Sequence, residues 1–385
     1  MLHSIHSKDI FDEITASFDD SNAESRFFFL DGPGGSGKTY LYNTLMCYVR
    51  GKGQKVQAFA TTGIAADLLA SGRTAHSGFK IPLSANETSV SNMKIPSLAS
   101  SKLKEASLLI IDEASMLSTH SLRVIDLLLR EIMNDIRPFG GKLLILGGDF
   151  RQTTNVVPRG SVTDIIELCV KNSPLWRHVK QRSLITNMRS ANQTEFNDWV
   201  LRLGDDKLTN DIDGFDPELI EIPNEMIEKE DIICSIFGSQ IRTFTPDEIA
   251  ETAKKVILTP KNIDVTQLNF KILELITGDE TIYMSIDTMI SDDPNDAIDF
   301  PVEFLHAQCP SGMPPHLLKL KVGAFIMLLR NLNPKKGLLN GTRLIVKVFI
   351  EIVSKLKSLQ VVIRVKKYVF HESTWSRVRA ACHSE

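Results

Sequence analysis

The sequence predicts an α/β fold in which helices cover both faces of a parallel β-sheet. Two observations predict it. Short apolar runs alternate along the chain with segments of helical periodicity, and these runs are apolar throughout, as in strands buried on both faces. Polar clusters also follow the runs directly. Because ligands of parallel sheets bind beyond the carboxyl ends of the strands, we expect one binding site at a single edge of the sheet.

Length and composition are those of an ordinary globular protein. The chain has 385 residues, enough for two or three domains, of which 43% are hydrophobic and 24% are charged. No apolar run is long enough to cross a bilayer, and the start of the chain has no signal-peptide core. We therefore expect an intracellular protein that does not bind a membrane. The five cysteines are scattered without C-x-x-C spacing, which indicates neither a disulfide framework nor a zinc site.

The chain begins with an expected helix within residues 1–24. Ile10, Ile14 and Phe18 recur at helical spacing and predict one buried face. A first strand is expected at residues 26–31, followed by a helix at residues 40–50. Four further apolar runs are expected to be strands of the same sheet, at residues 55–60, 108–111, 142–146 and 182–186.

Residues 32–39, between the first strand and its helix, read Gly-Pro-Gly-Gly-Ser-Gly-Lys-Thr and match the phosphate-loop pattern G-x-x-x-x-G-K-[ST] at every fixed position. The glycines let successive N–H groups point at an anion, and the helix dipole adds to this attraction. Lys38 is predicted to reach the β- and γ-phosphates of ATP, and the Thr39 hydroxyl to bind Mg²⁺. The remaining predicted nucleotide-binding residues are Gly32, Gly34, Gly35, Ser36 and Gly37.

An acidic pair, Asp112 and Glu113, follows the apolar run at residues 108–111. The aspartate is predicted to hold Mg²⁺ through water, and the glutamate to orient and deprotonate the water that attacks the γ-phosphorus. Alone, such a pair is common. In combination with the phosphate loop it predicts a nucleotide hydrolysis site.

Two further residues are candidates for contact with the γ-phosphate. Gln152, in the Gly-Asp-Phe-Arg-Gln sequence of residues 148–152, is predicted to bind both the water and the phosphate; its alternative is a polar loop residue. Arg189, after the fifth apolar run, is predicted to stabilise the phosphoryl group during its transfer, although an isolated arginine in such a place is usually a surface residue.

Charge is unevenly distributed, although the net charge is only −3. Residues 205–231 contain eleven acidic and two basic residues, which is typical of a solvated linker. Residues 316–380 contain fourteen basic and two acidic residues. The basic residues alternate with apolar ones, which predicts a folded segment whose charged side either faces solvent or binds phosphates.

Taken together, these motifs resemble the PIF (petite integration frequency) helicases, of the RecD-like branch of superfamily one, and most closely the type encoded by Helitron transposons. The resemblance also includes residues 61–66 (Thr-Thr-Gly-Ile-Ala-Ala), residues 72–77 (Gly-Arg-Thr-Ala-His-Ser) and residues 186–189 (Thr-Asn-Met-Arg). It covers roughly residues 25 to 348.

The resemblance implies two RecA-like domains. The first, at residues 25–200, would bind ATP and Mg²⁺. An acidic linker at residues 201–245 would lead to a partial second domain at residues 246–348, with a small β-barrel-like insertion. Asn340 and Gly341 lie between apolar runs of this insertion and predict a tight hairpin.

The resemblance also implies a function, ATP-dependent movement 5′ to 3′ along single-stranded DNA with unwinding at junctions of single and double strands. It implies a nuclear location and roles in DNA repair, recombination and telomere maintenance. Thr62, Thr74 and His76 would contact DNA phosphates; the alternative for these residues is helix capping and loop hydrogen bonding.

The chain departs from the family pattern after Leu344. A Thr-x-Asn-Lys-x-Gln-Gly stretch and a final Ala-x-Ser-Arg are absent, and residues 349–385 form a divergent basic tail. The adenine-recognising glutamine of the family is also absent; either Ser7 takes its place or truncation has removed it. We therefore expect nucleotide binding but inefficient unwinding. The alternatives are a transposon-derived remnant that binds ATP and DNA, and a small-molecule kinase, for which no acceptor pocket or lid is evident.

Overall fold

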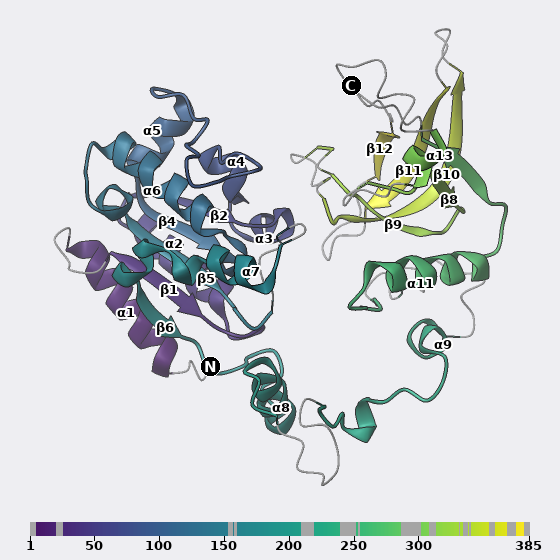
Figure 1. Cartoon of the computed structure of the whole chain (residues 1–385), viewed down its shortest axis with the longest axis horizontal. Coiled ribbons are helices and arrows are strands. Elements are labelled where there is room, and N and C mark those ends of the chain that lie inside the picture. The colour runs from purple at the N-terminus through teal and green to yellow at the C-terminus, as the bar shows by residue number, and fades with distance from the viewer. Residues whose placement is uncertain are drawn as a thin grey trace. The chain divides into compact units, whose positions relative to one another are not determined.

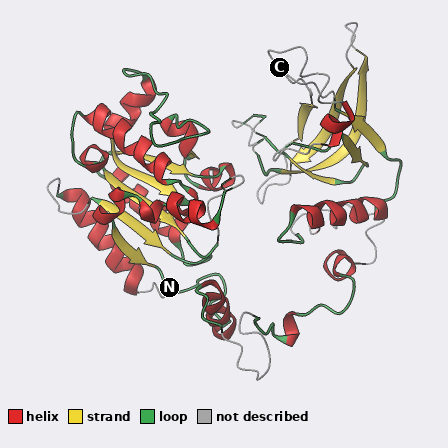
Figure 2. Ribbon diagram, viewed as in Figure 1, coloured by secondary structure: helices red, strands yellow, loops and turns green. Residues whose placement is uncertain are grey.

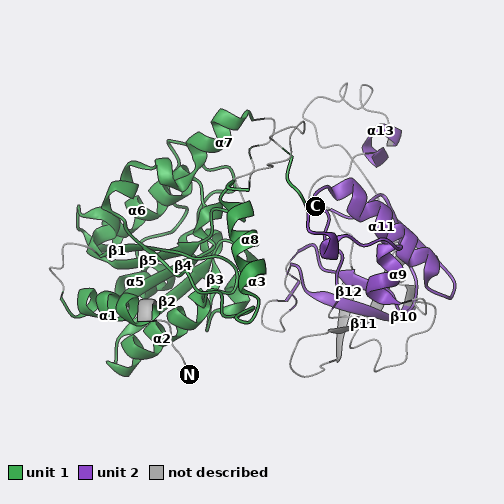
Figure 3. Cartoon of the chain, turned by 90° about the horizontal axis from the view of Figure 1, so that it is seen from below, with its two compact units in different colours: residues 1–221 green, residues 222–385 purple. Residues whose placement is uncertain are grey.

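A computed structural model of the chain describes residues 5–20, 26–152, 157, 160–208, 219–238, 252, 255–285, 302–307, 313–330, 332–333, 338, 340–353, 359–367 and 375–380. The chain forms two compact units, residues 1–221 and residues 222–385 (Figure 3). Within the described ranges, no helix has both the length and the apolar character needed to cross a membrane.

Unit 1 contains the predicted parallel sheet, which has six strands in the order β3-β2-β4-β5-β1-β6 (Figure 1). All of its strand pairs are parallel. The α/β prediction is therefore confirmed. The strands are β1 Phe27–Asp31, β2 Lys55–Ala60, β3 Arg73–Thr74, β4 Ala106–Asp112, β5 Leu143–Gly148 and β6 Lys180–Ser183.

Two strands differ from the sequence prediction. β3 was not predicted, because two residues are too few to produce a recognisable pattern. The strand predicted at residues 182–186 was placed too late, since β6 ends at Ser183. Its only neighbour in the sheet is β1, whose last residue, Asp31, pairs with Ser183. Leu184 still donates its N–H to the carbonyl oxygen of Asp31 at 2.8 Å, but β1 ends at Asp31 and offers no further residue to those that follow.

Helices cover both faces of the sheet, as Figure 2 shows. Alternate residues of the strands face two separate cores: Phe28 and Leu30 pack with α1, α2 and α3, whereas Phe27 and Phe29 belong to the core of α4, α5 and α6. This alternation explains why the strands are apolar throughout. The helices are α1 Ile5–Asp19, α2 Lys38–Gly51, α3 Gly63–Leu68, α4 Ala75–Phe79, α5 Leu98–Glu105 and α6 Thr119–Met133.

The remaining helices of unit 1 are short or lie outside the two cores. They are the 3₁₀-helices η1 Ala114–Met116, η2 Pro138–Gly141, η3 Val170–Asn172 and η4 Pro174–His178, and the α-helices α7 Val162–Leu168 and α8 Thr194–Gly204.

Unit 2 contains two antiparallel sheets. β7 Thr281–Met284 pairs with β8 Leu317–Leu320. The larger sheet has the order β12-β11-β10-β9, from β9 Phe325–Met327, β10 Arg343–Val353, β11 Leu359–Lys367 and β12 Trp375–Ala380. A small core joins Ile233, Ile276 and Ala324. The helices are η5 Asn224–Met226, α9 Ile232–Phe237, α11 Asn262–Leu275 and α13 Val302–Ala307.

The tight hairpin predicted at Asn340 and Gly341 is not formed. β9 and β10 are antiparallel and adjacent, but the connection between them contains an antiparallel bridge between Asn333 and Leu338, so the chain reverses before Leu338. Gly341 lies at the end of that connection and donates its N–H to the carbonyl oxygen of Leu328 at 2.7 Å. The basic segment at residues 316–380 is folded into strands as predicted, whereas the side chains beyond residue 349 lie outside the described ones.

Replacing Leu129 by alanine is expected to lower the free energy of unfolding by about 2–5 kcal/mol, because this α6 side chain is fully buried in the core. Urea denaturation followed by circular dichroism measures the loss. The control, Ile136→Ala, changes a side chain that is 90% exposed and should alter stability by no more than about 0.5 kcal/mol. Equal losses in the two variants would contradict the packing of α6.

Candidate functional site

The phosphate loop connects β1 to α2 and is held in a conformation that needs glycine. Gly35 and Gly37 have φ angles of 87° and 89°. A Cβ atom on Gly35 would lie 2.5 Å from Oδ1 of Asn187 and 2.8 Å from Cβ of Arg189. Glycine therefore allows both the left-handed backbone and the close approach of the segment at residues 187–189.

The loop has unused hydrogen-bonding capacity. The Ser36 hydroxyl is buried and has no hydrogen-bond partner among the described residues. Leaving a buried polar group unpaired costs about 1–3 kcal/mol. The Lys38 ammonium donates to the carbonyl oxygen of Gly32, within its own loop. A glycine-rich loop with an orphaned hydroxyl and a lysine folded back upon it fits an anionic ligand such as a triphosphate.

The acidic pair lies at the end of β4, where Asp112 is only 7% exposed. Its Oδ1 atom accepts a hydrogen bond from the buried Tyr42 hydroxyl at 3.1 Å. Burial raises the pKa of Asp112, although the Glu113 N–H, the Tyr42 hydroxyl and the positive charge of Lys38 act in the opposite direction. The interaction with Lys38 indicates that the carboxylate and the loop lysine belong to one cluster.

Glu113 adopts an unusual backbone conformation, with φ 53° and ψ 36°. A non-glycine residue in this left-handed region costs about 1–3 kcal/mol, and such strain clusters at functional sites. Burial raises the pKa of Glu113, the neighbouring Asp112 raises it further, and Lys38 lowers it. The raised pKa makes this carboxylate a better proton acceptor than an ordinary surface glutamate.

Gln152 lies against the phosphate loop. Its Nε2 atom donates to Oδ2 of Asp149 at 2.9 Å, and the same atom is 3.4 Å from the place where a Cβ atom of Gly34 would be. Asp149 follows the end of β5, next to β1 in the sheet. The amide is therefore fixed by a carboxylate and sits beside the tip of the loop.

Arg189 reaches the loop through a short turn that the sequence did not reveal. The Met188 N–H donates to the Gly35 carbonyl oxygen at 2.8 Å. Oδ1 of Asn187 accepts the N–H of Arg189 at 2.9 Å and fixes the turn. The Arg189 side chain is exposed and makes no ion pair with a described residue. An asparagine just after a strand is a signal for such a turn.

The sequence analysis also missed Arg151, which joins three aspartates at the same edge. Its guanidinium contacts Asp31 at 3.2 Å, Asp149 at 2.9 Å and Asp205 at 2.7 Å. Burial would lower the pKa of Arg151, but the hydrogen bonds that it donates to these carboxylates raise it well above the ordinary value. The arginine connects the ends of β1 and β5 to the residue that follows α8.

The candidate DNA-contacting residues lie on the first turns of two helices. Oγ1 of Thr62 caps α3 by accepting the N–H of Ala65, and Oγ1 of Thr74 caps α4 by accepting the N–H of Ser77. His76 is half-buried, and burial lowers its pKa. Capping is the alternative that the sequence offered for the threonines, and contact with DNA stays a prediction.

A cavity of about 280 Å³ adjoins the loop on its α2 side. Its lining is mainly apolar and includes the side chain of Tyr40, which is 60% exposed. Thr39, the predicted Mg²⁺ ligand, is exposed at the start of α2. The other residues that line the cavity are Ser7, Ser36, Gly37, Leu184, Ile185, Thr186 and Met188.

Comparison with known protein families gives two matches. A family described as PIF1-like helicase matches residues 3–214, and one described as DNA helicase Pif1, 2B domain, matches residues 303–349. A relative from Psychrobacter sp. (strain PRwf-1), named ATP-dependent DNA helicase Pif1, is 28% identical over 320 residues. The match covers 82% of this chain but 43% of the relative, so the chain spans less than half the length of that protein.

Solved structures share the fold. The crystal structure of Pif1 helicase from Candida albicans has a TM-score of 0.61 at 22% identity, over 98% of this chain and 79% of the other. Pif1 helicase from Bacteroides in complex with ADP-AlF3 and ssDNA has a TM-score of 0.55 at 20% identity, with the same coverage of both chains. At these identities the likeness shows the fold.

Replacing Arg151 by methionine is expected to lower the free energy of unfolding by about 3 kcal/mol, because it leaves the buried Asp149 carboxylate without its cation. Thermal and urea denaturation measure the loss. The control is Lys207→Met, which also contacts Asp205 but is 66% exposed, and should cost no more than about 1 kcal/mol. An Arg151 variant as stable as this control would contradict a structural role for the three-aspartate contact.

Proposed function

This chain belongs to the PIF1-like helicase family, and we propose that it is an ATP-dependent DNA helicase. In this proposal it couples ATP hydrolysis to movement 5′ to 3′ along single-stranded DNA. The observation that carries the proposal is the gathering of Lys38, Glu113 and Arg189 around one glycine-rich loop. Phosphoryl transfer to water requires a cation that binds the phosphates, a base that accepts the proton of the water, and a guanidinium that stabilises the transferred group.

Each side chain is assigned one task. Lys38 binds the β- and γ-phosphates, and the backbone N–H groups and the Ser36 hydroxyl bind the phosphate oxygens. Glu113 orients the attacking water and accepts its proton. Gln152, held by Asp149, binds the same water and the γ-phosphate. Arg189 stabilises the negative charge that develops on the transferred group.

A metal ion fits the same cluster. Thr39 supplies a hydroxyl at the start of α2, and Asp112 supplies a buried carboxylate whose raised pKa marks it as a group in need of a cation. These two residues would hold Mg²⁺, which neutralises charge on the phosphates when it is bound. Tyr42 fixes the orientation of Asp112 through its hydroxyl.

The apolar cavity beside the loop is assigned to the adenine base. It adjoins Ser36 and Gly37 of the phosphate loop, and Tyr40 and Met188 offer apolar surfaces to a flat ring. Ser7 lines the same cavity and offers one hydroxyl to the edge of the base. A single hydroxyl recognises less of the base edge than a carboxamide does, so weak discrimination between purine nucleotides is expected.

DNA is assigned to the edge that carries α3 and α4. The hydroxyl oxygens of Thr62 and Thr74 accept backbone N–H groups, but each hydroxyl keeps its own proton as a donor. Capping and contact with a DNA phosphate are therefore compatible. The bound DNA of the Bacteroides Pif1 structure supports a single-stranded partner.

The finer family placement is part of the same proposal. The Helitron-encoded type is proposed from the resemblance of all the motifs taken together. A nuclear location, binding to junctions of single and double strands, and roles in DNA repair, recombination and telomere maintenance are proposed from the family alone. The proposed roles in repair, recombination and telomere maintenance depend on unwinding, which the experiment below is designed to detect.

The decisive experiment measures ATP hydrolysis with and without single-stranded DNA. Single-stranded DNA is expected to stimulate hydrolysis, and Lys38→Ala and Arg189→Ala should each lower the stimulated rate by about 100-fold or more. A strand-displacement assay on a duplex with a 5′ single-stranded tail measures unwinding. The control Lys102→Ala changes an exposed lysine away from the loop and should keep the full rate.

The outcomes separate the alternatives. ATP binding without DNA-stimulated turnover would support a remnant that binds but does not unwind. Hydrolysis that is indifferent to DNA would contradict both DNA-dependent functions. An Arg189 variant with full activity would remove this residue from the proposed mechanism and leave the assignment of the loop intact.

A further inference from the structure

A second cavity of unit 1, of about 500 Å³, lies at the amino ends of the strands. Arg26 precedes β1, Gln54 precedes β2, Ser107 is the second residue of β4, and Lys142 precedes β5. The phosphate loop follows the carboxyl end of β1, so the cavity is at the other edge of the same parallel sheet. Its volume lies within the range of about 300–1,000 Å³ that is typical of small-molecule sites.

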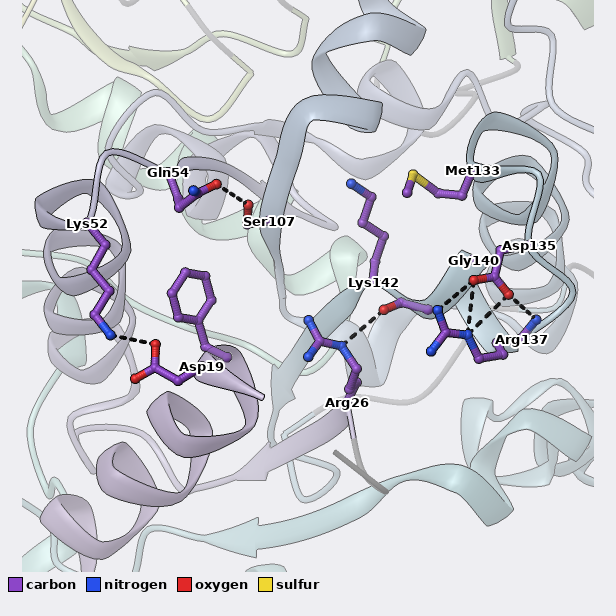
Figure 4. Close-up of a pocket in the computed structure, with 12 residues that line it drawn as sticks. Asp19, Arg26, Lys52, Gln54, Ser107, Met133, Asp135, Arg137, Gly140 and Lys142 are labelled. Atoms are coloured by element: carbon purple, nitrogen blue, oxygen red, sulfur yellow. Dashed lines mark hydrogen bonds and ion pairs between the residues drawn. The ribbon is translucent and has the colours of Figure 1, made fainter. Parts of the chain in front are cut away.

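Two cations in this cavity make no ion pair within the part of the chain that the structure describes, although the carboxylate of Asp20 acts on one of them, Arg26. Lys52 pairs with Asp19, and Arg137 pairs with Asp135. These pairs stand on two sides of the cavity in Figure 4, and Arg26 and Lys142 lie between them. Neither Arg26 nor Lys142 makes an ion pair with any described residue. Lys142 is only 9% exposed, so its charge is poorly hydrated.

Backbone carbonyl groups satisfy these cations in part. The Lys142 ammonium donates to the carbonyl oxygens of Lys104 and Ala106, at the end of α5. The Arg26 guanidinium donates to the carbonyl oxygen of Ser17, in the last turn of α1, at 2.7 Å. A helix C-terminus carries roughly half a negative charge, so two helix ends offset about one of the two positive charges. By side chains, the cavity is lined by four cations and two carboxylates, so its lining has an excess of positive charge.

Both cations also keep unused donors. An ammonium has three N–H groups, of which Lys142 uses two. The Nη2 group of Arg26 has no acceptor among the described residues, because its hydrogen bonds come from Nε and Nη1. The charge of Arg26 acts on Lys142, and that of Arg137 acts on Arg26, so cations are held close together against their mutual repulsion.

We propose that this cavity binds a phosphate group, either free or at the end of a small organic molecule. A phosphate monoester carries a charge of about −1.5 to −2 at neutral pH, which balances the excess positive charge of the lining side chains. A guanidinium binds two phosphate oxygens side by side, and an ammonium adds a point charge. Phe18 and Met133 line the cavity and provide an apolar wall for an organic part. The site does not depend on the proposed nucleotide chemistry.

The test uses the full chain with Lys38→Ala, which weakens phosphate binding at the glycine-rich loop. Isothermal titration calorimetry with inorganic phosphate is expected to detect one site. Adding Lys142→Met should lower the affinity about ten-fold or more, as expected when a charge-assisted hydrogen bond is lost. The matched control, Lys52→Met, removes a lysine of the same cavity that is already paired, and should change the affinity by less than about three-fold.

A second probe identifies the source of the phosphate. Phenyl phosphate that binds more tightly than inorganic phosphate supports an organic ligand held against Phe18 and Met133, whereas equal affinities support free phosphate. Arg26→Lys keeps the charge but removes the planar fork, and should weaken both probes. Affinities that are unchanged by both Lys142→Met and Arg26→Lys would overturn the proposal.

The pH dependence of sulfate binding tests the role of Lys142 without a substitution in the cavity. Sulfate keeps both of its negative charges throughout the neutral and mildly alkaline pH range, because its conjugate acid is much stronger than a carboxylic acid side chain. Burial, with Arg26 and Lys104, lowers the pKa of Lys142 to about 8. The protonated lysine binds the anion, so affinity should be constant well below pH 8 and fall as the pH rises through about 8.

Other charged groups near Lys142 do not produce this fall. The arginines keep their charge throughout. Hydrogen bonds with Asp19 and Tyr48 raise the pKa of Lys52, and hydrogen bonds with their basic partners lower the pKa of Asp19 and Asp135. The fall should be absent in Lys142→Met. A sulfate affinity that is independent of pH, or no sulfate binding at any pH, would contradict the site. The charged groups that face Lys142 are Asp19, Arg26, Lys52, Lys104, Asp135 and Arg137.

Discussion

The parallel pairing of β1 with β5, and of β5 with β4, is the constraint on which the site depends. Asp31 pairs with Gly148, and Ile111 pairs with Leu146, so three chain segments leave the sheet at one edge within a residue or two of each other. The phosphate loop, the acidic pair and the Asp149 turn follow directly. Because the strands are buried on both faces, a shift in register would exchange the two cores, and the strand ends are therefore held firmly.

Negative charge at this edge is divided between two cations. Arg151 takes Asp31, Asp149 and Asp205, which would otherwise repel one another. Lys38 acts on Asp112 and Glu113, whose pKa values stay above their ordinary range because burial outweighs its effect. The first group is neutralised within the protein and holds the framework together. In the second group the two carboxylates of Asp112 and Glu113 exceed the single charge of Lys38. Excess negative charge of this kind favours binding of a metal ion and acceptance of a proton.

Local patterns predicted five of the six strands of this sheet, β2 with its observed bounds, and one motif predicted the phosphate loop. Contacts between distant segments were not predictable. Arg151 lies 120 residues from Asp31, and no periodicity relates it to its partners. β6 ends at Ser183, opposite the last residue of β1. The chain is therefore free to turn at Asn187 and to bring Arg189 close to Gly35. These features depend on register, which a single sequence does not reveal.

Opposite edges of the sheet attract opposite charges for one topological reason. Helices that connect parallel strands run against them, so helix N-termini gather at the carboxyl edge and helix C-termini at the amino edge. The N–H groups at the start of α2 therefore point into the phosphate loop. At the other edge, carbonyl groups at the ends of α1 and α5 accept hydrogen bonds from Arg26 and Lys142. Helix ends explain why cations lie at the amino edge. They do not explain why the cations that line this cavity outnumber its carboxylates, an excess that a bound anion would balance.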